Sequence, residues 1–280
     1  MKNPSETVLK AFLSRCEPEK KRALEGFLPD IERARLEDTP GFAEEIEPQK
    51  FANGNLWEKV HWSWFLPTLK TYDETEQKLF LSALTTHAAK NLAKTLMLSS
   101  YAQEVTHVAK DYLRKVLIDS LIGPHDRLLP AEYLSKSPLK GLLKLSKNKL
   151  THIIDLLSLY DLSAELRQIV ETKILKKIYS LLTEEERTFL KKAMTHKEHM
   201  ILARMGLDRF DGTEETLRTL LHRRGLARLA AALCGQEPDF IWYVCHQLDI
   251  GRGTALFKQC AKDPIPGVTE AIIAQVEELL

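Results

Sequence analysis

Apolar residues recur along most of this chain at the spacing of an amphipathic helix. Two such stripes follow one another between residues 76 and 96, the first over Leu79, Phe80, Leu81, Ala83 and Leu84 and the second over Ala88, Ala89, Leu92, Ala93 and Leu96. That spacing places one apolar face on each of two short helices. No run alternates apolar and polar residues over more than a few positions, so the pattern predicts no sheet. The expected fold class is all-α.

Capping signals mark the starts of several predicted helices. Asp73 stands three residues before Glu76, Thr183 stands three residues before Glu186, and Thr213 precedes a pair of glutamates. A capping oxygen placed in this way binds a free backbone N–H, and the Glu side chain reaches back to a second one. We therefore expect helices to begin directly after Asp73, Thr183 and Thr213.

Two regions share a plan of one short helix followed by an Ala-rich helix, namely residues 66–96 and 217–233. Small residues on the second helix allow close crossings, which favours short helix pairs stacked in an armadillo-like manner in two lobes. The breakers Gly123-Pro124 and Ser137-Pro138 suggest where the lobes divide. We predict an N-terminal helix and loop-rich linker over 1–55, a first lobe over 56–135 and a second lobe over 136–280.

The charge balance excludes a general attraction to nucleic acid. The 280 residues hold 40 Lys+Arg against 39 Asp+Glu, a formal net charge of +1 at pH 7, whereas binding through the overall field needs a large positive excess. The sequence has no basic segment followed by an apolar one at its start, and no apolar stretch of about 18 residues, the length that a bilayer span needs. We expect a cytoplasmic protein without a membrane span.

Metal-binding spacings are weak in this sequence. The cysteines at 16, 234, 245 and 260 form no C-x-x-C pair, which favours buried thiols in a reducing compartment. A zinc site made of Cys234, Cys245, His246 and Cys260 would lack the short ligand spacing of known zinc sites. His196 and His199 lie three residues apart without a third ligand, so a solvated turn is favoured over ligation. We expect no metal and no cofactor.

Catalytic signatures are also absent from the sequence. It contains no phosphate-binding G-x-x-x-x-G-K-[ST] loop, no dinucleotide fingerprint and no G-x-S-x-G elbow. The Gly251-Arg252-Gly253 turn follows no predicted strand, so it does not indicate a dinucleotide site. The prediction is a protein that is not an enzyme.

Two basic clusters are candidates for binding. The first holds Lys136, Lys140, Lys144, Lys147 and Lys149, which suit either phosphate or an acidic partner, or form a solvated face. The second holds Arg218, His222, Arg223, Arg224 and Arg228. Arginine is preferred for paired hydrogen bonds with carboxylates, so this cluster fits either an acidic partner helix or internal pairing with Glu214 and Glu215.

Three tryptophans, Trp57, Trp62 and Trp64, lie within eight residues of one another. Tryptophan is enriched in the hot spots of protein interfaces, and it is also a large side chain that fills a core. The group is therefore either an interface anchor or the filling of the seam between the linker and the first lobe.

Residues 217–280 resemble the carboxy-terminal domain of the flagellar motor switch protein FliG. The run Leu226–Leu233 is followed by a Gly-containing turn, then by Asp249-Ile250-Gly251-Arg252-Gly253 where that family has Met-Ser-x-Arg-Ala, and then by Pro266-Gly267-Val268 where it has Gly-Pro-Val. Arg252, Val268 and Ala271 match best. The Met-Ser is missing, the Gly-Pro order is inverted, and the Glu-His-Pro-Gln signature of the FliG middle domain has no counterpart.

Residues 60–84 are similar to a FliG-like family encoded among the type III secretion genes of chlamydia-type bacteria. The resemblance implies a cytoplasmic accessory of the injectisome, placed like the SctK-type adaptor between the membrane ring and the sorting platform. On this basis we expect a non-catalytic scaffold that binds protein subunits of a secretion or motor complex. The tryptophan group and Arg218, Arg223, Arg224 and Arg228 are its predicted contacts. The alternative is a nucleic-acid-binding or regulatory helical protein that uses the lysines of 136–149.

Overall fold

The helices of this chain begin where capping side chains meet apolar stripes. In the computed structural model, Asp73 and Glu76 form a reciprocal capping box at the start of α7 (Glu74–Ala83). Thr183 and Glu186 do the same at the start of α12 (Glu184–Thr195). The Thr213 hydroxyl accepts from the N–H of residue 216 and caps α13 (Glu214–Leu233). The three predicted helix starts are confirmed.

The structure describes residues 9–38 except 11 and 15, 56–123 except 102 and 103, 128–195 except 170, and then 206, 207, 210–260 and 263–280. Within these ranges helix is the only regular secondary structure, so the all-α prediction is confirmed for them. None of the helices described there combines the length and the apolar character that a bilayer crossing requires. His196 and His199 lie outside the described residues.

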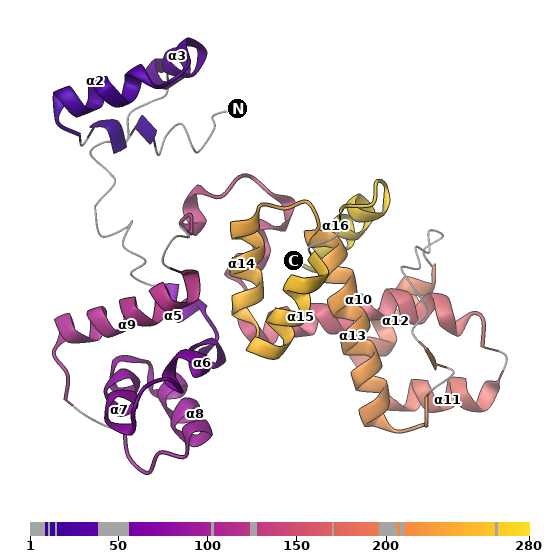
Figure 1. Cartoon of the computed structure of the whole chain (residues 1–280). Coiled ribbons are helices and arrows are strands. Elements are labelled where there is room, and N and C mark those ends of the chain that lie inside the picture. Colours follow the sequence, from indigo (N-terminus) through magenta and orange to yellow (C-terminus); the bar gives the residue numbers. More distant parts are fainter. Residues whose placement is uncertain are drawn as a thin grey trace. The chain divides into compact units, whose positions relative to one another are not determined.

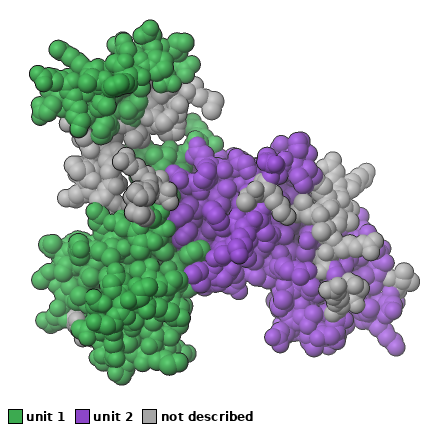
Figure 2. All heavy atoms as spheres, in the orientation of Figure 1, with its two compact units in different colours: residues 1–136 green, residues 137–280 purple. Residues whose placement is uncertain are grey.

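The chain divides into two compact units, residues 1–136 and 137–280 (Figures 1 and 2). Unit 1 starts with a helical hairpin of α2 (Pro18–Gly26) and α3 (Asp30–Asp38). Arg33 closes the hairpin, because its Nε donates to Glu25 O at 3.2 Å and its Nη2 donates to Leu28 O at 3.1 Å. These bonds tie α3 to the end of α2 and to the loop between the two helices.

The rest of unit 1 consists of short helices. The elements that follow the hairpin are α5 (Leu56–Lys59), η1 (Trp62–Phe65), α6 (Leu66–Leu69), α7, α8 (Thr86–Leu96), α9 (His107–Ile122) and η2 (Ala131–Tyr133). α7 packs against both α8 and α9, and α9 and η1 each contact several of these elements. Leu69, Leu92 and Leu117 are completely buried in this unit, and each such side chain stabilises the fold by roughly 2 kcal/mol.

Unit 2 is organised by the packing of α13 on α10. Its elements are η3 (Pro138–Lys144), α10 (Lys147–Leu166), α11 (Thr172–Leu181), α12, α13, α14 (Pro238–Gln247), α15 (Ile250–Cys260) and α16 (Val268–Leu279). α10 also packs against α12, while α13 packs against α15 and α16 (Figure 1). One cluster of buried apolar residues, including Leu159, Leu162, Ile178, Leu190 and Leu217, joins α10, α11, α12 and α13.

A glycine sets how closely α10 and α13 approach each other. A Cβ atom added to Gly225 would lie 1.8 Å from the carbonyl oxygen of Ile154 and 2.7 Å from its carbonyl carbon. Because both atoms belong to the backbone of α10, no side-chain rotation relieves the overlap. The two helix backbones therefore touch at a point where only glycine fits.

Replacing Gly225 with alanine should force α10 and α13 apart. Although alanine favours helix by about 1 kcal/mol, the overlap with Ile154 outweighs this gain, and we expect Gly225→Ala to lower the free energy of unfolding by about 2 kcal/mol or more. Gly251→Ala in α15 is the matched control, since its Cβ would meet nothing closer than 3.5 Å. Urea denaturation followed by circular dichroism measures both. Equal stability of the two variants would contradict the close crossing.

Candidate functional site

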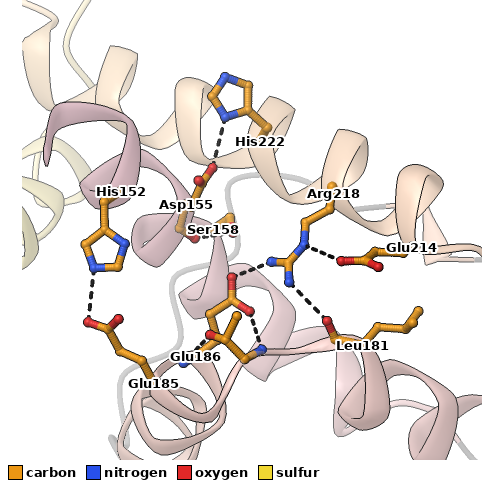
Figure 3. Close-up of polar contacts among 10 residues, drawn as sticks. His152, Asp155, Ser158, Leu181, Glu185, Glu186, Glu214, Arg218 and His222 are labelled. Carbon is orange, nitrogen blue, oxygen red and sulfur yellow. Dashed lines mark hydrogen bonds and ion pairs between the residues drawn. The ribbon is translucent and has the colours of Figure 1, made fainter. Parts of the chain in front are cut away.

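Arg218 joins α13 to two neighbouring elements of unit 2 (Figure 3). Its guanidinium forms an ion pair with Glu186 at the start of α12, and its Nη2 donates to Leu181 O at the end of α11 at 3.0 Å. On its own helix it also lies 3.7 Å from a carboxylate oxygen of Glu214. The internal pairing with Glu214 that the sequence left open is therefore present.

The Glu186 carboxylate is held ionised by these contacts. Burial would raise its pKa, but hydrogen bonds from Arg218 and from the backbone N–H of Thr183 outweigh burial and hold the pKa below its ordinary value. Burial alone would lower the pKa of Arg218. The hydrogen bond to Glu186 and its negative charge outweigh burial, so the pKa of Arg218 is raised. The pair therefore stays charged over the whole physiological range.

Two histidine–carboxylate pairs lie beside Arg218 and bind α10 to its neighbours (Figure 3). His222 of α13 approaches Asp155 of α10, with 2.9 Å between Nδ1 and Oδ1. His152 of α10 approaches Glu185 of α12, with 3.1 Å between Nε2 and Oε1. Each contact crosses from one helix to another, so the polar side chains in this region hold helices together.

Arg224 and Arg228 share one buried carboxylate. Arg224 donates to Asp161 Oδ2 from Nε at 3.0 Å and from Nη2 at 2.7 Å, and Arg228 pairs with the other oxygen, Oδ1. Arg228 Nη2 also donates to Gln275 Oε1 of α16 at 2.7 Å. Burial lowers the pKa of Arg228, while the Asp161 carboxylate acts in the opposite direction.

The arginines predicted to form one exposed binding face are divided by the structure. Arg224 and Arg228 are 8% and 1% exposed, Arg218 is half-buried in its ion pairs, and Arg223 is exposed. Spacing along one helix predicts one surface for all four arginines, because it does not reveal their partner Asp161. A signal for Asp161 existed, since it interrupts the apolar run from Leu156 to Leu162, and a lone acid in such a run needs a buried partner.

The tryptophan group is also divided. Trp57 is buried, with the Arg114 guanidinium carbon 4.0 Å from its ring centroid, an arrangement that favours the cation. Trp62 and Trp64 are half-buried in η1. Trp57 therefore fills the inside of unit 1, while Trp62 and Trp64 keep part of their surface accessible.

The predicted buried thiols lie inside unit 2. Cys234, Cys245 and Cys260 are buried and reduced, whereas Cys16 is half-exposed. Burial raises the pKa of Cys245 and raises that of Cys260 to about 12, so these thiols remain protonated at neutral pH. No group of three or more potential metal ligands occurs in the part of the chain that the structure describes.

One of the lysines of 136–149 is paired within unit 2, and others are exposed. Lys147 lies 3.7 Å from Asp249 Oδ2, so one of the five charges is compensated within unit 2. Lys144 and Lys149 are exposed. The nucleic-acid alternative therefore stays a prediction.

No protein-family model matches this chain, and no curated protein and no solved structure matches it either.

Removing the charge of Asp161 should destabilise unit 2 strongly. Asp161→Asn leaves two buried guanidinium groups without a carboxylate, and breaking a buried pair in this way costs about 3 to 5 kcal/mol. Glu184→Gln is the control, because its pair with Arg187 is exposed and lies within one helix and is worth less than about 0.5 kcal/mol. Urea denaturation compares the two; a small effect of Asp161→Asn would show that the network does not hold the fold.

Unfolding should become easier in acid because of His246. Its ring stacks on Trp242, with centroids 3.8 Å apart, and its Nδ1–H donates to Trp242 O at 2.8 Å. Burial lowers the pKa of His246 from 6.5 to about 4. Between pH 6.5 and pH 4 the unfolded chain binds a proton at His246 and the folded chain does not. The free energy of unfolding is therefore largest above about pH 6.5 and falls toward pH 4, by about 3 kcal/mol. His246→Phe should flatten this part of the pH profile in urea titrations; unchanged slopes would contradict the assignment.

Proposed function

We propose that this protein is a non-catalytic scaffold or adaptor that binds other protein subunits in the cytoplasm. The apparatus is a type III secretion system or a flagellum-related machine. The proposal starts from the likeness of residues 217–280 to the FliG carboxy-terminal domain and of residues 60–84 to FliG-like secretion proteins. In this proposal the helices of the two units correspond to armadillo-like, FliG-like stacks of short helix pairs.

One observation carries the adhesive part of the proposal. Ten large apolar side chains are exposed among the described residues, and seven of them belong to residues 1–136: Phe12, Phe27, Ile31, Leu79, Met97, Val108 and Tyr112. Val108 and Tyr112 are one helical turn apart on α9, so they share one side of that helix. Neighbouring exposed apolar side chains, such as Val108 and Tyr112, are characteristic of surfaces that bind other proteins.

The charged groups of unit 2 support the same proposal in another way. Asp155, Asp161 and Glu186 are each engaged by a basic side chain from another helix. Side chains paired between helices fix the positions of those helices. A scaffold needs such fixed positions. Four members of the predicted contact set keep accessible surface, namely Trp62, Trp64, Arg218 and Arg223. Of these, Arg218 is already engaged in ion pairs within unit 2.

The test is co-purification of the full chain with each secretion subunit encoded beside its gene. We expect at least one subunit to be retained, and we expect Trp62→Ala/Trp64→Ala or Arg223→Glu to weaken its retention by about tenfold, the effect of losing a central contact. Lys258→Glu, an exposed charge change on α15, should leave retention unchanged.

Two results would contradict the proposal. Recovery of no subunit, under conditions that recover a known secretion pair, would remove the assignment to this apparatus. Tight binding of DNA or RNA that falls steeply with added salt would favour the nucleic-acid hypothesis instead, since phosphate contacts release counterions.

A further inference from the structure

One side of α8 carries a row of side chains that the fold of unit 1 does not use. His87, Lys90, Lys94 and Met97 follow one another at intervals of three, four and three residues, which places them along one side of a helix. All four are exposed. The buried residues of α8 lie on its other side, so this row is free to contact another molecule.

The row is basic, and no carboxylate of the residues that the structure describes forms an ion pair with its lysines. No acidic residue occurs between Glu76 and Glu104. The ammonium groups of Lys90 and Lys94 form no hydrogen bond or ion pair with any residue that the structure describes. Lys94 stands in the last turn, where the helix dipole favours a cation, but this does not account for Lys90, which lies one turn earlier.

Met97 holds a backbone conformation that favours glycine. Its φ is 59° and its ψ is 32°, and Leu98 N donates to Ala93 O at 3.0 Å, the pattern of a helix that ends with a left-handed residue. It is the only residue other than glycine with a positive φ among those described. Its side chain is 93% exposed. The chain therefore keeps a large apolar group at a strained position without burying it.

We propose that this row on α8 binds an acidic amphipathic helix of a partner protein. Two carboxylates of that helix, one turn apart, pair with Lys90 and Lys94, and an apolar part of the partner covers Met97. The flexible thioether side chain of methionine adapts well to such a surface. This inference rests on the adhesive function proposed above and specifies its surface and the chemistry of its partner.

The same observations favour a protein over a nucleic acid. The row holds only two unpaired ammonium groups, and it contains no Trp, Tyr or Phe on which bases would stack. A phosphate backbone gains no stabilisation from the apolar side chain of Met97, whereas an apolar helix face is stabilised by covering it. Opposite charges around an apolar contact set both the register and the choice of partner.

The experiment uses the full chain with 13C-labelled methionine methyl groups, of which there are five, and a synthetic helical peptide built from Glu and Leu at amphipathic spacing. The methyl resonance of Met97, assigned with Met97→Leu, should shift to saturation as peptide is added. Lys90→Glu/Lys94→Glu should weaken binding at least about tenfold, because attraction becomes repulsion.

Met97→Gly separates folding from binding. Glycine relieves the left-handed conformation, so the variant should unfold at the same or a higher temperature. It should nevertheless bind the peptide about fivefold more weakly, because the apolar contact is lost. A purely structural role for Met97 would give neither result.

Lys173→Glu/Lys177→Glu is the matched control, since it reverses the charges of two exposed lysines one turn apart on α11. It should leave peptide binding unchanged.

Three results would overturn the inference: equal binding of a peptide with Gln in place of Glu, an equal loss of binding in the control variant, or an equal shift of the Met97 resonance with a single-stranded oligonucleotide. If secretion subunits bind the native chain and Lys90→Glu/Lys94→Glu equally, this inference fails while the proposed function stands. If the native chain binds the peptide but no secretion subunit, the proposed function fails while the acidic-helix site on α8 stands.

Discussion

The carboxylate of Asp161 is the group on which the arrangement of unit 2 depends. It is completely buried, and it accepts hydrogen bonds from Arg224 at Oδ2 and from Arg228 at Oδ1. A buried charge is costly unless it is fully paired, so α10 and α13 have one alignment that satisfies this group. Gly225 allows the backbones to come close enough for that alignment, and Gln275 extends the network to α16. Polar pairing and close packing thus select the same geometry.

Local features of the fold were predictable from the sequence because they depend on near neighbours in the chain. The capping boxes at Asp73 and Thr183, and the absence of sheet in the described residues, follow from spacing alone. The burial of Arg224 and Arg228 depends on a partner more than 60 positions away in the chain, Asp161. Spacing within one helix cannot reveal such a partner. Arg224 and Arg228 were therefore placed on the surface in the sequence argument, although their pairing decides the interior.

The exposed row on α8 was not predictable for a different reason. Its basic residues are visible in the sequence, but the left-handed backbone of Met97 is a property of the folded helix end. Sequence rules place glycine there, so a methionine at that point gives no warning. In unit 2 the buried carboxylates Asp161 and Glu186 are paired between helices, while seven of the ten exposed large apolar side chains belong to unit 1. That difference supports binding through unit 1.

The protonated state of the interior thiols has a consequence for oxidative damage. Peroxides attack the thiolate and not the thiol, and a pKa raised to about 12 keeps the Cys260 thiol protonated at neutral pH. Cys245 is protected in the same way by its burial. The Cys245 and Cys260 thiols should therefore resist modification during redox stress, and a sulfenic acid or mixed disulfide should form at the half-exposed Cys16, near the α2–α3 hairpin, before it forms at either of them.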